Sequence, residues 1–72
     1  MITHEQALEL ATSMIVERFG AKALDGLRSS VVDEGGKFRV AFEPGDPNTL
    51  GGGPNVVLNA EDGTLIELYR TQ

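Results

Sequence analysis

Apolar side chains recur at helical spacing over residues 3–19, which predicts an amphipathic helix at the start of the chain. Thr3 is a favourable N-cap, and Gln6 follows it at the spacing of a capping box. We expect Gly20 to end the helix in the left-handed conformation that glycine adopts without steric cost. The apolar positions on one side of this helix are Ala7, Leu8, Leu10, Ala11, Met14, Ile15 and Phe19.

The pattern changes to strict alternation over residues 37–43, which predicts a strand with one buried face. On this strand Phe38, Val40 and Phe42 point to the core, and Arg39 and Ala41 point away from it. Apolar runs predict further strands at 30–34, 55–60 and 64–70, with turns at 35–36 and 61–63. Residues 21–28 are expected to form a connector with a short helical turn, and residues 44–54 a loop.

These elements predict an α+β fold: one N-terminal amphipathic helix packed on an antiparallel β-meander of three or four strands. At 72 residues the chain is expected to form a single domain, residues 1–72. A core of this size supplies only about 3–5 kcal/mol, and the absence of Cys excludes a disulfide. Support from a bound partner or from homodimer formation is therefore expected.

The charge balance changes the range of partners. Six Lys and Arg residues against eleven Asp and Glu residues give a net charge of −5. This balance argues against nucleic acid, whose phosphates need clustered cations, and it suits a basic protein partner. No apolar run approaches the roughly 20 residues of a membrane span. The first nine residues hold two acids and neither Lys nor Arg, unlike a secretory signal, so we expect a cytoplasmic protein with no membrane contact.

Residue types that carry catalysis or bind metals are sparse. His4 is the sole His, is expected on the solvent side of the helix, and lacks the other ligands of a zinc site. The Ser residues at 13, 29 and 30 stand in no nucleophile elbow, and the acid pairs at 33–34 and 61–62 match no EF-hand loop, even combined with Asp46. The glycine run before Pro54 leads into a strand, whereas a phosphate loop opens a helix. We therefore expect no enzyme, no cofactor and no metal.

The outward face of the sheet and the glycine run are the candidate interaction surface. Arg39 and Tyr69, beside Ala41 and either Leu65 or Val57, have the composition of a protein contact patch. Glycines at the start of a strand let a partner's backbone approach closely. The residues assigned to partner binding are Arg39, Ala41, Gly51, Gly52, Gly53 and Tyr69.

The stretch GGGPNVVLNAEDGTLIELYRTQ, from Gly51 to Gln72, resembles the C-terminal half of small bacterial immunity proteins with a nuclear-transport-factor-2-like fold. The shared features are a glycine pair, an alternating strand, an acidic turn ending in Gly, and a last strand with a short polar tail. Full members of that fold carry more helices around a curved sheet than the one predicted here. Residues of the first half that fit the resemblance are Ala7, Ala11, Phe19, Gly20, Phe38, Val40 and Phe42.

This resemblance implies a cytoplasmic, non-enzymatic protein that binds and neutralises a cognate toxin. Two alternatives stay open. The C-terminal hairpin is also similar to that of PepSY-type domains, which bind or inhibit peptidases, and the uncovered sheet face suits a self-associating structural module. A pocket for a small molecule between helix and sheet has no base, nucleophile or metal set to support it. The residues that fit the PepSY pattern are Val57, Asn59, Asp62, Gly63 and Leu65.

Overall fold

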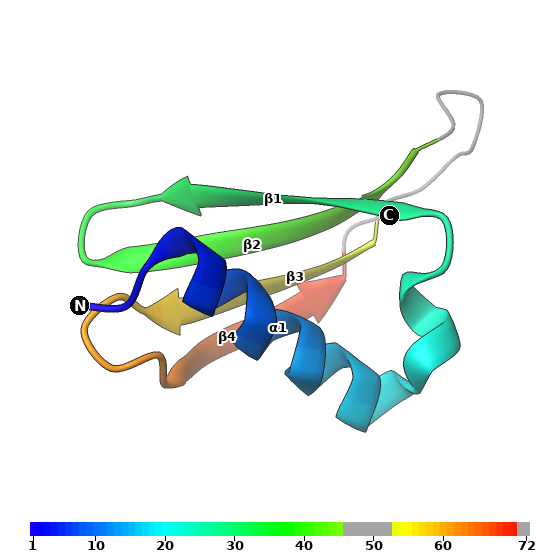
Figure 1. Ribbon diagram of the computed structural model, residues 1–72, viewed down its shortest axis with the longest axis horizontal. Helices are drawn as coiled ribbons and strands as arrows, with labels where there is room; N and C mark the ends of the chain where they lie inside the picture. The colour runs from blue at the N-terminus through cyan, green and yellow to red at the C-terminus, as the bar shows by residue number, and fades with distance from the viewer. Residues whose placement is uncertain (46–52, 71–72) are drawn as a thin grey trace.

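The computed structural model describes residues 1–45 and 53–70. Its strands form one antiparallel sheet in the order β1-β2-β3-β4, with the helix on one face (Figure 1). The predicted α+β arrangement of one N-terminal helix on a meander is confirmed, and the meander has four strands. The sheet is not closed, so β1 and β4 are edge strands. The elements are α1 (His4–Phe19), the 3₁₀ turn η1 (Ala21–Leu24), β1 (Leu27–Asp33), β2 (Lys37–Pro44), β3 (Pro54–Asn59) and β4 (Leu65–Arg70).

Both ends of α1 are fixed by the residues that the sequence marks. The Thr3 hydroxyl accepts a hydrogen bond from the Gln6 backbone N–H at 3.1 Å, and the Gln6 side chain accepts one from the Thr3 N–H at 2.9 Å. This reciprocal pair is the predicted capping box. Gly20 ends the helix with a positive φ of 94°, but its ψ of 159° lies outside the left-handed helical region that was expected. Its conformation is one that favours glycine all the same.

The β1–β2 hairpin turns at Gly35 and Gly36, as predicted. Their φ values of 69° and 83° match a two-residue turn in which both central residues are left-handed. Glu34 donates its backbone N–H to the Lys37 carbonyl at 2.8 Å and closes the turn. β1 begins at Leu27, three residues before the predicted start, because residues 27–29 pair with residues 42–44 of β2. Tertiary pairing, rather than local strand preference, extends β1 here.

The core lies between α1 and the sheet. Ala7, Ala11 and Ile15 of the helix are fully buried, and the small Ala side chains let the helix approach the strands closely. Burying a side chain as large as Ile15 or Leu58 contributes about 1.5–3 kcal/mol. The predicted inward face of β2 is confirmed. The sheet residues of the core are Phe38, Val40, Phe42, Val56 and Leu58, with Ala60 just beyond β3.

The β3–β4 hairpin contains an irregularity that decides which residues share a face. Val57 pairs with Glu67, whereas its neighbour Leu58 pairs with Leu65, so Ile66 is an extra residue in β4. Side chains alternate along regular strands, but this bulge breaks the alternation between 65 and 67. Leu65 therefore lies on the helix side of the sheet with Leu58, while Glu67 lies on the opposite side with Val57.

Candidate interaction surface

The sheet face opposite α1 is covered by no helix or strand among the described residues; we call it the open face. Side chains of paired residues lie on the same face of a sheet, so the register defines its rows. One row crosses all four strands as Ser30, Ala41, Asn55 and Tyr69, and the next as Val32, Arg39, Val57 and Glu67. The sequence left either Leu65 or Val57 beside Arg39 and Tyr69. The register shows that it is Val57, because Leu65 lies on the helix side of the sheet.

Arg39 stands in the middle of β2 with 34% of its side chain exposed. Its Nε donates to Oε2 of Glu34 at 3.2 Å, which connects β2 to the β1–β2 turn. A guanidinium has five N–H donors, and this ion pair engages one of them. Arg39 is therefore held in place by Glu34 and keeps donors for a partner.

Tyr69 lies half-buried on the edge strand β4, opposite Asn55. β4 and β2 are separated by β3, and each strand spacing is about 4.8 Å, so Tyr69 and Arg39 stand roughly 10 Å apart or more. The structure places both on the open face without bringing them into contact. A partner that touches both must cover the ground between them.

The surface between Arg39 and Tyr69, which we call the floor, consists of side chains that are almost fully buried. Ala41 and Asn55 are each 4% exposed, and Val57 is 5% exposed. Ala41 thus offers little surface of its own. Asn55 donates its side-chain N–H to the Gly53 carbonyl at 3.4 Å, which ties the floor to the start of β3.

Gly53 is buried and packs against the backbone of Phe42. Glycine is needed at this position because two backbone segments of the molecule approach each other closely here. The other glycines assigned to partner binding, Gly51 and Gly52, lie outside the described residues.

The ring of His4 packs edge-on against Phe38, with centroids 5.0 Å apart and an interplanar angle of 76°. The expected position on the solvent side is therefore only half right, since the residue is exposed but its ring contacts the core. Within residues 1–45 and 53–70 no three His, Cys, Asp or Glu side chains converge as a metal site would require. Asp46 lies outside the described residues.

Acidic side chains beside two of the turns form hydrogen bonds within those turns. Asp33 accepts a hydrogen bond from the Gly35 N–H at 3.1 Å. Asp62 accepts from the Thr64 N–H at 3.0 Å and from the Thr64 hydroxyl at 2.8 Å. These bonds stabilise the carboxylate and hold the pKa of Asp62 below its usual value of 3.8. Both side chains brace their own turns.

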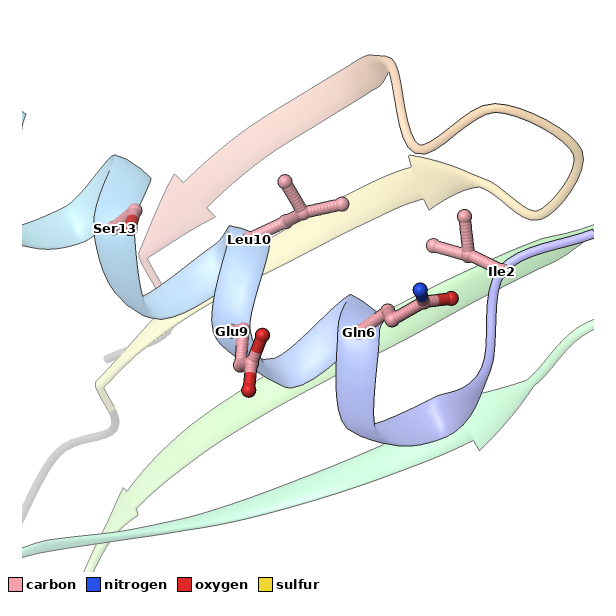
Figure 2. Close-up of a pocket in the computed structure, with 5 residues that line it drawn as sticks. All are labelled: Ile2, Gln6, Glu9, Leu10 and Ser13. Atoms are coloured by element: carbon pink, nitrogen blue, oxygen red, sulfur yellow. The ribbon is translucent and has the colours of Figure 1, made fainter.

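A second surface was not predicted. A groove of about 350 Å³ runs along the flank of α1 beside the β3–β4 hairpin (Figure 2). The sequence placed Leu10 among the apolar positions of α1, but the structure leaves its side chain 36% exposed at this groove. The residues that line the groove are Ile2, Gln6, Glu9, Leu10 and Ser13.

Among the described residues, no helix combines the length and the apolar content needed to cross a bilayer. Comparison with protein-family models, curated proteins and solved structures finds no match to this chain.

Proposed function

We propose that this protein is a non-enzymatic binding protein that recognises a partner protein through its open face and the glycine run at residues 51–53. We further propose that the partner is a basic toxin, which the protein neutralises in the manner of the immunity proteins that its sequence resembles. The observation that carries the proposal is the open face itself: a full sheet surface with Arg39 and Tyr69 standing at the sides of an aliphatic and amide floor.

The physical argument rests on what such a face offers. Arg and Tyr are the residue types that most often dominate binding energy, because each combines a large contact area with directional hydrogen bonds. Arg39 is pre-positioned by Glu34, so less side-chain entropy is lost on binding. Val57 and Asn55, which are almost fully buried, form the surface between these two residues. The net charge of −5 favours encounter with a basic partner.

The experiment is affinity purification from the native cell, followed by measurement with the purified partner. The double variant Arg39→Ala/Tyr69→Ala should weaken binding by at least about tenfold, since each hot spot is worth more than about 1 kcal/mol. The matched control, Lys22→Ala/Phe19→Ala, removes one cation and one exposed aromatic ring outside the open face and should leave affinity within about twofold.

The inhibitory role has its own readout. The partner expressed alone should arrest growth, and co-expression of this protein should restore it. Co-expression of the control variant should also restore growth, whereas the Arg39→Ala/Tyr69→Ala variant should not. Equal affinity of both variants for the partner would refute the assignment of the binding surface. A partner that does not harm cells would refute the proposal that the partner is a toxin.

Self-association is the second candidate function, favoured by the open edges of β1 and β4 next to the uncovered face. A dimer formed through the open face should dissociate when Arg39 and Tyr69 are both replaced by Ala. Analytical ultracentrifugation distinguishes the two functions, because a protein that stays monomeric at high micromolar concentration does not act by self-association.

A further inference from the structure

The helix side of β4 carries apolar side chains that the fold leaves exposed. Leu65 and Leu68 pair with Leu58 and Val56, which belong to the core, so they lie on the face that α1 covers. The helix packs on β1, β2 and β3 more closely than on β4. As a result Leu65 is 40% exposed, Leu68 is half-buried and the bulge residue Ile66 is 53% exposed.

The groove on α1 adjoins this apolar strip. Figure 2 shows Ile2 and Leu10 pointing to the same side of the helix, towards the β3–β4 hairpin, with Gln6 between them. Ile2 is fixed to the hairpin by a backbone hydrogen bond to the Ala60 carbonyl at 2.8 Å. A Cβ placed on Gly63 would lie 2.7 Å from Cδ1 of Leu10, so the helix side chain and the turn already touch. Ile2 and Leu10 form the apolar wall of the groove, and Gln6, Glu9 and Ser13 supply its polar groups.

The side chains around the groove carry mostly negative charge. α1 and the β3–β4 hairpin, residues 54–70, together hold six acidic side chains and two cations, Arg18 in the last turn of α1 and Arg70 at the end of β4. Glu9 lines the groove, and Glu61 and Asp62 stand exposed on the adjoining turn. By contrast, the β1–β2 hairpin, residues 27–44, holds three acids and three cations.

We propose that the groove and the exposed apolar strip of β4 bind a cationic amphipathic segment of a partner protein, with aliphatic side chains against Leu10 and Leu65 and Lys or Arg facing Glu9 and the acidic turn. A symmetric contact between two copies through this side would set the same acids against one another, and like charges across an interface are strongly disfavoured. An anionic lipid or nucleic-acid surface is repelled for the same reason. This proposal is independent of the open face, because the two surfaces lie on opposite sides of the sheet.

The test uses a defined probe: a short synthetic peptide of alternating Lys and Leu residues, titrated into ¹⁵N-labelled protein and followed by ¹H–¹⁵N NMR. Shifts should be confined to the amides of residues 2–13 and 60–68, and affinity should fall as salt is raised. A peptide in which Ser replaces Leu carries the same charge and should bind at least about tenfold more weakly, because it offers no apolar side chains to bury.

Two variants separate the groove from overall acidity. Glu9→Lys and Glu17→Lys change the net charge equally on exposed positions of the same helix, but Glu17 lies outside the groove. Glu9→Lys should lower the affinity for the Lys-Leu peptide by about tenfold, and Glu17→Lys should lower it by no more than about twofold. Equal effects of the two variants, equal binding of the Ser peptide, shifts centred on Arg39 and Tyr69, or no saturable binding would each overturn the proposal.

Discussion

Gly53 lies so close to the backbone carbonyl of Phe42 that a Cβ at Gly53 would overlap that carbonyl group. The overlap involves main-chain atoms, which a rotamer change does not relieve. We therefore predict that Gly53→Ala lowers the free energy of unfolding by at least about 2 kcal/mol, measured by urea denaturation. Gly45→Ala is the matched control, because its Cβ would meet the flexible Arg28 side chain at 3.3 Å and should cost less than about 1 kcal/mol. Similar losses for both variants would contradict the close approach.

The capping box predicts that replacing Thr3 and replacing Thr12 by Ala have opposite effects on stability. Thr3→Ala removes the hydroxyl that accepts from the Gln6 N–H and should destabilise the protein by about 1 kcal/mol. Thr12→Ala lies inside α1, where Ala is the better helix former, and should stabilise by a few tenths of a kcal/mol. Thermal unfolding monitored by circular dichroism at 222 nm would resolve the two. A neutral Thr3→Ala would show that the cap is not formed in solution.

The turn at Asp62 predicts a pH dependence with a definite sign. The pKa of Asp62 is lowered on folding, chiefly by the Thr64 N–H and then by the Thr64 hydroxyl. Its contribution to stability is therefore complete above the unfolded pKa of 3.8 and is lost as pH falls through the lower folded value. Carboxyl ¹³C titration should place the midpoint of Asp62 below the usual value of 3.8. Thr64→Val, which removes the hydroxyl alone, should raise the Asp62 pKa, and an unchanged midpoint would contradict this assignment.

The Arg39–Glu34 pair is half-exposed and should matter little for stability. A double-mutant cycle with Arg39→Ala and Glu34→Ala should give a coupling free energy of about 0.2–1 kcal/mol that shrinks at high salt. This small value is what makes Arg39→Ala a clean probe of partner binding, since the variant should stay folded. A coupling free energy well above that range would mean that loss of binding by the variant includes loss of structure.

Much of the fold follows from local pattern. The Thr3 cap, the alternation around Val40 and the paired glycines of the first turn each have a short-range physical cause, and the structure agrees with each. The apolar spacing of α1 also predicted the helix, although Leu10 and Phe19 of its apolar side stay exposed. The early start of β1 has no such local cause, because Arg28 and Ser29 carry little strand preference and are held by pairing with β2.

The surfaces were harder to predict because they depend on register. Period-two alternation over residues 64–70 would place Leu65 beside Glu67 and Tyr69, and one extra residue at Ile66 reverses that assignment. The groove on α1 depends on how far the helix extends over the sheet, a relation between distant segments that no local pattern records. Apolar side chains that stay exposed, such as Leu10 of α1 and Leu65 of β4, cannot be told in the sequence from those that are buried.

The uneven distribution of charge along the chain gives the molecule an electric dipole moment. Acidic side chains outnumber basic ones six to two in α1 and the β3–β4 hairpin, whereas the β1–β2 hairpin holds three of each. In the field of a charged partner such a molecule experiences a torque before any side chains touch, so encounters begin with a preferred orientation. The rate of association with a basic protein should therefore depend on ionic strength more steeply than the rate of dissociation.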